Sequence, residues 1–137
     1  MPADRSTSKS RLPPLLRDRP TPVIIVLAGV IPVAFGVLTG FALDQSAAAY
    51  FILLALAAIG GIGAGFDHDG AGEGARRGLV GGVLFTAGIL GTNEVIGAAH
   101  ADELPHPNVL LFVINGAFGV LFGALGGRLR ARRTHVA

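Results

Sequence analysis

The sequence predicts an all-α integral membrane bundle of four transmembrane helices, with both the N- and the C-terminus in the cytoplasm. A mean hydropathy of +0.62 and 51% hydrophobic residues are too high for a soluble domain of 137 residues. The apolar residues gather in four segments of about 20 residues, the length that an α-helix needs to cross the hydrocarbon core of a bilayer.

The eleven Lys and Arg residues all fall on one side of these four segments. Five precede the first segment, two lie between the second and the third, and four follow the fourth, whereas the connections 44–46 and 101–107 contain none. Cytoplasmic loops of membrane proteins carry such an excess of basic residues. We therefore expect a multi-pass protein of the plasma (inner) membrane. Ten arginines against one lysine, with many Ala and Gly, is a composition typical of bacteria with GC-rich genomes.

The first span is expected over residues 22–43. Pro20 and Pro22 suit its start, because the first turn of a helix has no internal acceptor for its N–H groups. Pro32 lies inside the span and is expected to kink the helix or to open its hydrogen-bond ladder locally. Membrane helices tolerate such a proline when neighbouring groups satisfy the freed carbonyl.

The other spans are expected over residues 47–65, 78–99 and 109–127, with short outer connections that make two antiparallel hairpins. Residues 1–21 are rich in Pro, Ser and charge and are predicted to be a disordered basic cytoplasmic tail, and residues 128–137 to be a second basic tail. Basic tails next to a bilayer attract anionic lipid headgroups. We expect no nucleic-acid partner, because these arginines sit directly against the spans without aromatic neighbours.

Glycines recur in steps of four along the spans. Such steps place the glycines on one helix face, where the absence of side chains lets two backbones approach closely. We expect these glycines to pack helices together, either within one bundle or between subunits of a homo-oligomer or a larger membrane complex. The predicted packing residues are Gly36, Gly40, Gly61, Gly65, Gly78, Gly82, Gly119, Gly123 and Gly127.

Glu94 is the one Asp, Glu, Lys, Arg or His residue inside a predicted span. Its neighbours at three and four positions are mostly small, so we expect it to face another helix. A carboxyl group there is expected to be protonated, paired or reached by water. Asn115, which heads the glycine steps of the fourth span, is its predicted partner. Together with Asn93 and Thr39, these residues form a predicted polar cluster close to the outer surface.

Two interpretations of this cluster compete. In the first, it is an interhelical clasp whose hydrogen bonds contribute about 0.6 kcal/mol each, and the protein is a structural or accessory subunit. In the second, Glu94 is the proton- or cation-binding site of a small oligomeric transporter or channel. The substitution Glu94→Gln separates them, because a packing contact tolerates an amide and a coupled transporter does not.

An enzyme is not expected from this sequence. The chain has no cysteine, and no Ser/His/Asp, Cys/His or metal-ligand constellation falls at one membrane depth. Asp67, Asp69 and Glu73 lie close together among glycines, but two ligand positions of an EF-hand calcium loop are occupied by Ala71 and Gly78. We expect Asp67 or Asp69 to satisfy local backbone groups and Glu73 to pair with a following arginine. The sequence therefore predicts no metal, cofactor or catalytic residue.

Overall fold

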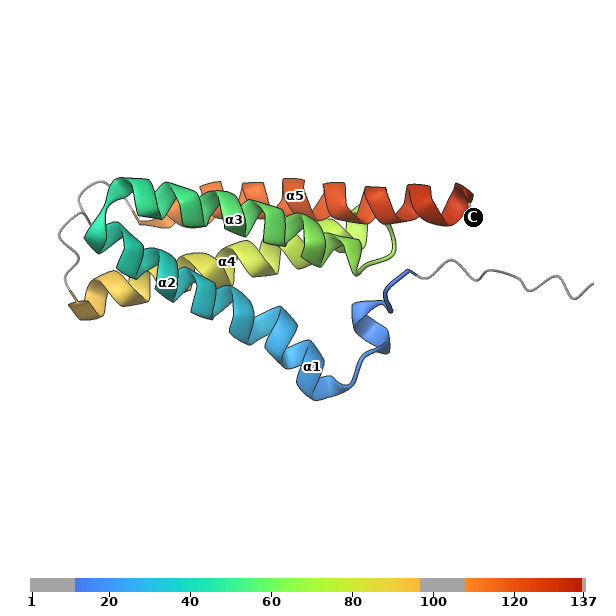
Figure 1. The fold of residues 1–137 in the computed structure, drawn as a ribbon, viewed down its shortest axis with the longest axis horizontal. Helices are drawn as coiled ribbons and strands as arrows, with labels where there is room; N and C mark the ends of the chain where they lie inside the picture. Colours follow the sequence, from blue (N-terminus) through green and yellow to red (C-terminus); the bar gives the residue numbers. More distant parts are fainter. Residues whose placement is uncertain (1–11, 97–107, 137) are drawn as a thin grey trace, which may run out of the picture.

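The computed structural model describes residues 12–96 and 108–136, which form an all-helical bundle (Figure 1). Four of its helices are long and apolar enough to cross a membrane: Thr21–Gln45, Ala47–Phe66, Gly70–Ile96 and Val109–His135. The described part of the chain contains no β-strand. The predicted fold class, a bundle of four helices able to span a membrane, is confirmed.

The first long helix consists of three parts: α1 (Thr21–Ile25), the π-helical segment η2 (Val26–Val30) and α2 (Ile31–Gln45). In η2 the backbone hydrogen bonds span five residues, so that the N–H of Ile31 donates to the carbonyl of Val26. Pro32 is the second residue of α2. The disturbance expected at this proline therefore takes the form of a wider helical turn directly before it.

Two residues set the turns on either side of α3 (Ala47–Phe66). Ser46 has an extended backbone, which ends α2, and its side chain accepts a hydrogen bond of 3.1 Å from the N–H of Ala49. Such a cap satisfies one of the free N–H groups at the start of a helix. Gly70, with φ of 84°, opens α4 (Gly70–Ile96) in a conformation that glycine adopts without strain.

The two central helices are α4 and α5 (Val109–Val136), which share the most extensive contact; α2 packs on α4, and α3 packs on α5. Figure 1 shows the helix α1–η2–α2 diverging from the others toward the end of the bundle where α5 finishes. We call this end, which carries the α3–α4 turn and the last turns of α5, the basic end. A core of large side chains fills the opposite half and comprises Leu43, Tyr50, Phe85, Ile89 and Leu111.

The structure differs from the sequence prediction at both ends of the chain. Part of the predicted disordered tail, from residue 12 onward, is described, and it includes the 3-10 turn η1 (Leu16–Asp18), in which Leu16 is buried. The predicted second tail is a continuation of α5 up to Val136. Helix α4 also begins eight residues before the predicted start of the third span, at Gly70 instead of residue 78. These extensions are held by contacts at the basic end, which hydropathy does not report.

Candidate functional site

The predicted packing glycines of α4 and α5 meet each other. A Cβ atom added to Gly78 would overlap the carbonyl oxygen of Gly119, and one added to Gly74 would overlap that of Gly123. The same holds for Gly82 against the backbone of Asn115 and for Gly127 against Gly70. The two backbones are therefore in direct contact along an antiparallel register. We call this contact the glycine seam: Gly70, Gly74, Gly78 and Gly82 of α4 with Asn115, Gly119, Gly123 and Gly127 of α5.

Other glycines bring α2 onto α4 and α3 onto α5. A Cβ atom on Gly36 would overlap the carbonyl of Phe85, and one on Gly40 would lie 2.8 Å from Cβ of Thr92. Gly65 lies against the backbone of Gly123 in the same way. Gly61 is different, because an added Cβ would meet only the Cβ of Phe122, at 3.5 Å. The packing thus lies inside one chain, and Gly61 has room beside it.

The glycine seam also fixes the position of Asn115, which is buried. Its side-chain amide donates a hydrogen bond of 3.0 Å to the hydroxyl of Thr86, and that hydroxyl in turn donates to the carbonyl of Gly82 at 2.9 Å. This is a neutral interhelical clasp between α4 and α5. Thr86 was not among the predicted cluster residues, although it lies four residues after Gly82 and so shares the face of α4 that meets α5.

The structure does not bring Glu94 to Asn115. Asn115 lies level with Gly82, and Glu94 lies twelve residues further along α4, roughly 18 Å at the rise of an α-helix. Glu94 is exposed, close to the end of α4. The sequence prediction aligned the two helices by the ends of their apolar segments, whereas backbone contact between glycines sets the actual register.

The other two predicted cluster residues are also separate from Asn115. Thr39 is fully buried and donates a hydrogen bond of 2.8 Å to the carbonyl of Phe35 in its own helix. Asn93 is partly buried, and its amide nitrogen and oxygen have no hydrogen-bond partner among the described residues. The polar cluster predicted from sequence is therefore divided into separate contacts along α2, α4 and α5.

A second group of polar residues gathers at the basic end, where the segment before α1 packs on the α3–α4 turn. Arg19 forms an ion pair of 2.9 Å with Asp67, and both side chains are only 22% exposed. Arg17 pairs with Asp69 at 2.8 Å in a more exposed position. The backbone N–H of Leu16 donates to the carbonyl of Asp67 at 2.9 Å. The acids of this turn therefore bind arginines from the N-terminal segment, a partnership that was not predicted.

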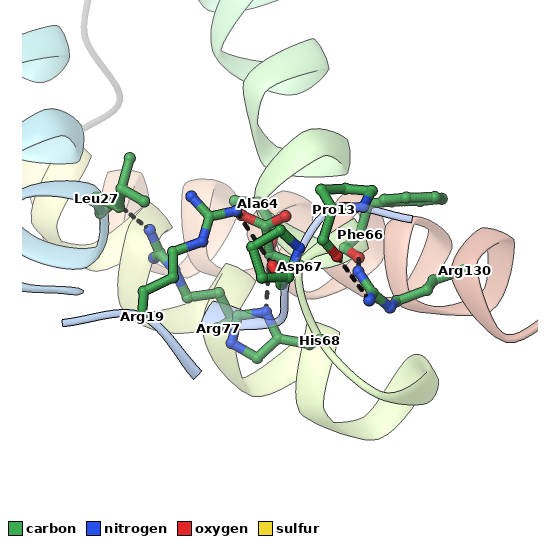
Figure 2. Close-up of polar contacts among 10 residues, drawn as sticks. Pro13, Arg19, Leu27, Ala64, Phe66, Asp67, His68, Arg77 and Arg130 are labelled. Carbon is green, nitrogen blue, oxygen red and sulfur yellow. Dashed lines mark hydrogen bonds and ion pairs between the residues drawn. The ribbon is translucent and has the colours of Figure 1, made fainter. Parts of the chain in front are cut away.

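Arg130 ties the end of α5 to the same place (Figure 2). Its guanidinium is buried and donates hydrogen bonds to the carbonyl of Phe66, at 3.0 Å, and to that of Pro13, at 2.8 Å. The guanidinium carbon also lies 5.8 Å from the centre of the Phe66 ring, within the range of a cation–π contact. This buried arginine explains why α5 continues in place of a tail.

Arg77 of α4 satisfies the backbone next to the π-helical segment (Figure 2). In a ladder of five-residue steps, the carbonyl of Leu27 would accept from residue 32, which is proline and has no N–H. Arg77 instead donates a hydrogen bond of 2.7 Å to this carbonyl. The sequence held the signal for this contact, since a proline inside a span calls for a donor from a neighbouring helix.

A cavity of about 690 Å³ lies between the helices and extends along α3 from Phe51, near the start of that helix, to Asp67 at the basic end. Its walls come from η2, α2, α3, α4 and α5, and Leu16 of η1 lies at its margin. Small residues of α3, including Ala57 and Gly61, leave the space open. The lining is mainly apolar and contains five aromatic rings, those of Phe35, Phe51, Phe85, Phe118 and Phe122. Its charged and amide groups are Arg77, Asp67 and Asn115.

No group of three or more potential metal-ligating His, Cys, Asp or Glu side chains occurs within residues 12–96 and 108–136. Comparison with known protein families, curated proteins and solved structures finds no match to this chain. The features available for a functional argument are therefore the glycine seam, the neutral Thr86–Asn115 clasp, the basic end and the apolar cavity.

Proposed function

We propose that this chain is a non-catalytic, multi-pass protein of the bacterial plasma membrane, acting as a structural or accessory subunit with both termini in the cytoplasm. The membrane location is supported by the four long apolar helices. The orientation is supported by the arginines, because every Arg in the described part of the chain lies near the basic end.

The observation that carries the accessory role is the chemistry of the bundle interior. Away from the basic end, where Arg130 is buried, the described buried polar side chains between helices are neutral: Thr39, Thr86, Thr92 and Asn115. Each has a hydrogen bond within the chain, as shown by Thr92, which donates to the carbonyl of Gly88 at 2.9 Å. A coupled transporter uses an ionisable group inside the membrane that exchanges a proton or a cation. Glu94 stands exposed near the end of α4 instead, roughly 18 Å along the helix from the level of Asn115.

A flux measurement tests this proposal. The wild-type chain and Glu94→Gln are reconstituted in liposomes, and proton and cation fluxes are recorded with an ionophore as the positive control. We expect both proteins to give the flux of empty liposomes, and both to elute as folded species. A flux in the wild type that disappears in Glu94→Gln would overturn the accessory role and make Glu94 a transport site.

The subunit assignment needs a positive readout as well. Two differently tagged copies of the chain are produced in the same cell and extracted from the membrane in a mild detergent. We expect the chain to migrate in an assembly larger than one 13.9 kDa chain with its bound detergent. The second tag shows whether that assembly contains another copy of the chain. A chain that migrates alone at every expression level contradicts the role of a subunit.

A further inference from the structure

The apolar cavity has the properties of a ligand site. Its volume of about 690 Å³ lies within the range of roughly 300–1,000 Å³ that small-molecule sites occupy. Such sites combine an apolar and aromatic lining with a few polar groups that orient the ligand. Here five phenylalanines, with alanines and glycines, provide the lining, and the only arginine in it is Arg77. A strongly polar substrate fits this lining poorly, since the mainly apolar walls offer it few hydrogen bonds.

The cavity opens sideways, toward the surrounding bilayer. Helix α2 packs on α3, but α1 and η2 make no substantial contact with α3. Figure 1 shows the corresponding divergence of α1 from the rest of the bundle. Because η2 lines the cavity through Leu27 and α3 lines it from Phe51 to Ala64, the side between these two elements is open. What lies outside that opening in a membrane is lipid.

The length of the cavity also fits a lipid chain. The lining residues of α3 run from Phe51 to Ala64, which is about 20 Å along the helix axis. One leaflet contributes about half of the roughly 30 Å of hydrocarbon in a bilayer. The space is therefore long enough to take one acyl chain over the full depth of a leaflet, about 15 Å, with the headgroup at the basic end.

The charges at the basic end indicate which headgroup. Asp67 and Arg77 both line the cavity, but the carboxylate of Asp67 is paired with Arg19 at 2.9 Å. Arg77 forms no ion pair among the described residues: its hydrogen bond goes to the neutral carbonyl of Leu27, and Asp67 acts on its charge only at longer range. A guanidinium has five N–H donors, so this bond leaves capacity for a phosphate oxygen. The net charge at the mouth of the cavity is thus positive.

We propose that the cavity binds one acyl chain of an anionic phospholipid from the leaflet at the basic end, with the lipid phosphate at Arg77. This binding site requires the membrane location but not the accessory role, so the flux measurement above leaves it standing. The Pro32-dependent π-helical segment creates the opening, and Arg77 serves both that segment and the headgroup.

Tryptophan fluorescence tests the site, because the chain contains no tryptophan. Phe122→Trp places a single reporter in the cavity, and Phe41→Trp places a matched reporter on the exposed surface of α2, outside it. Each protein is reconstituted in phosphatidylcholine vesicles with increasing fractions of phosphatidylglycerol whose acyl chains are brominated and quench tryptophan. We expect half-maximal quenching of the cavity reporter at a phosphatidylglycerol fraction about fivefold lower than for the surface reporter, the preference expected from one arginine.

Four further substitutions assign this preference to Arg77 and the quenching to the cavity. Arg77→Gln in the Phe122→Trp protein should abolish the fivefold difference, and Arg77→Lys should retain most of it. Gly61→Phe should fill the cavity and protect the reporter, since an added Cβ there meets only Phe122 at 3.5 Å, whereas Gly63→Phe on the open face of α3 should not. Folding is checked for each variant by circular dichroism and gel filtration, and Arg77→Lys keeps the test informative if Arg77→Gln does not fold.

Three results overturn the proposal. The first is a cavity reporter that no brominated lipid quenches, because the cavity is then closed to chains. The second is equal quenching by brominated phosphatidylcholine and phosphatidylglycerol, because chain entry then occurs without headgroup selection. The third is a phosphatidylglycerol preference that survives Arg77→Gln in a folded protein.

Discussion

On α5, glycines touch the backbone of the neighbouring helix, whereas on α3 an added Cβ would face open space at Gly60 and would meet only the Cβ of Phe122 at Gly61. The two helices carry similar numbers of glycines, four in α3 and five in α5, so the glycine count does not separate the two regions. What differs is the partner. Helix α4 presents its own glycines to α5 at the same four-residue step, whereas across the cavity from Gly60 and Gly61 the first long helix widens into the π-helical segment before Pro32 and diverges. Small residues thus allow backbone contact between two regular helices, whereas beside an irregular helix they leave a cavity.

The energetic consequences follow from this contrast. In a bilayer, close packing and hydrogen bonds hold helices together, because lipid chains are as apolar as leucine. The glycine seam therefore should carry much of the stability of the bundle. The cavity side contributes less packing, and there a single arginine compensates for the break in the backbone ladder.

The largest effect is expected from Gly78→Leu, in the middle of the glycine seam. A Cβ atom at this position overlaps the backbone of Gly119, which cannot move away as a flexible side chain would. We expect a loss of about 3 kcal/mol in the free energy of unfolding, at the upper end of overpacking effects. The loss is measured by unfolding in mixed micelles with increasing dodecyl sulfate.

Gly63→Leu is the matched control for this substitution. It makes the same change on the open face of α3, where an added Cβ has nothing within 4 Å. Its free energy of unfolding should stay within about 0.5 kcal/mol of the wild type. If the two substitutions destabilise equally, the contrast between the regions is not one of packing.

The contrast also indicates how far sequence reasoning reaches. Segment lengths and the arginine bias predict the four helices, because crossing a bilayer is a local property of about 20 residues. The four-residue steps of glycine predict which face of a helix is in close contact with another helix, but they do not predict which helix is the partner. Gly88 shows this limit. A Cβ atom added to Gly88 would meet the backbone of α2 near Val37, although Gly88 does not belong to the four-residue series of glycines that faces α5. Helix α4 thus packs through two faces, one against α5 and one against α2, and a single four-residue series of glycines could predict only one of them.

The site was harder to predict than the fold, because its residues come together through register. Moving α5 by a few residues along α4 decides whether Asn115 meets Thr86 or lies nearer to Glu94, and hydropathy leaves that shift undetermined. The ordered segment before α1 was missed for a related reason. Arg17 and Arg19 pair with Asp69 and Asp67, which lie about fifty positions later in the sequence. These acids are on a turn whose placement depends on the whole bundle.

An intermediate effect is expected from removing the contact between Arg77 and Leu27. Arg77→Met leaves the partly buried carbonyl of Leu27 without its donor, and we expect a loss of about 2 kcal/mol in the free energy of unfolding. Arg76→Met removes a basic residue from the exposed surface of the same helix turn. It should change the free energy of unfolding by less than about 0.5 kcal/mol.

A double-mutant cycle with Pro32→Ala shows whether the proline is the reason for this contact. Alanine at position 32 supplies an N–H that can reach the carbonyl of Leu27 in the five-residue ladder. Arg77→Met should then cost less in the Pro32→Ala protein than in the wild type, with a coupling of at least about 0.5 kcal/mol. Strictly additive losses contradict the link between Arg77 and the π-helical segment.

The smallest effect is expected at the basic end, where ion pairs hold the segment before α1. The Arg19–Asp67 pair is 22% exposed on both sides, and the Arg17–Asp69 pair is 63% and 49% exposed, so solvent screens the second pair more strongly. Exposed pairs contribute between 0 and about 1 kcal/mol. Arg19→Gln should therefore loosen the segment more than Arg17→Gln, with both losses below about 1 kcal/mol.

Such small differences are better measured by local opening than by global unfolding. Hydrogen exchange at the amide of Leu16, which is bonded to the carbonyl of Asp67, should accelerate about threefold in Arg19→Gln and less in Arg17→Gln. The double exchange Arg19→Asp with Asp67→Arg should restore part of the protection, since it keeps the pair in reversed order. If both single substitutions accelerate exchange equally, burial of the pair is not what holds the segment, and the buried Leu16 side chain and the Arg130–Pro13 hydrogen bond must hold it instead.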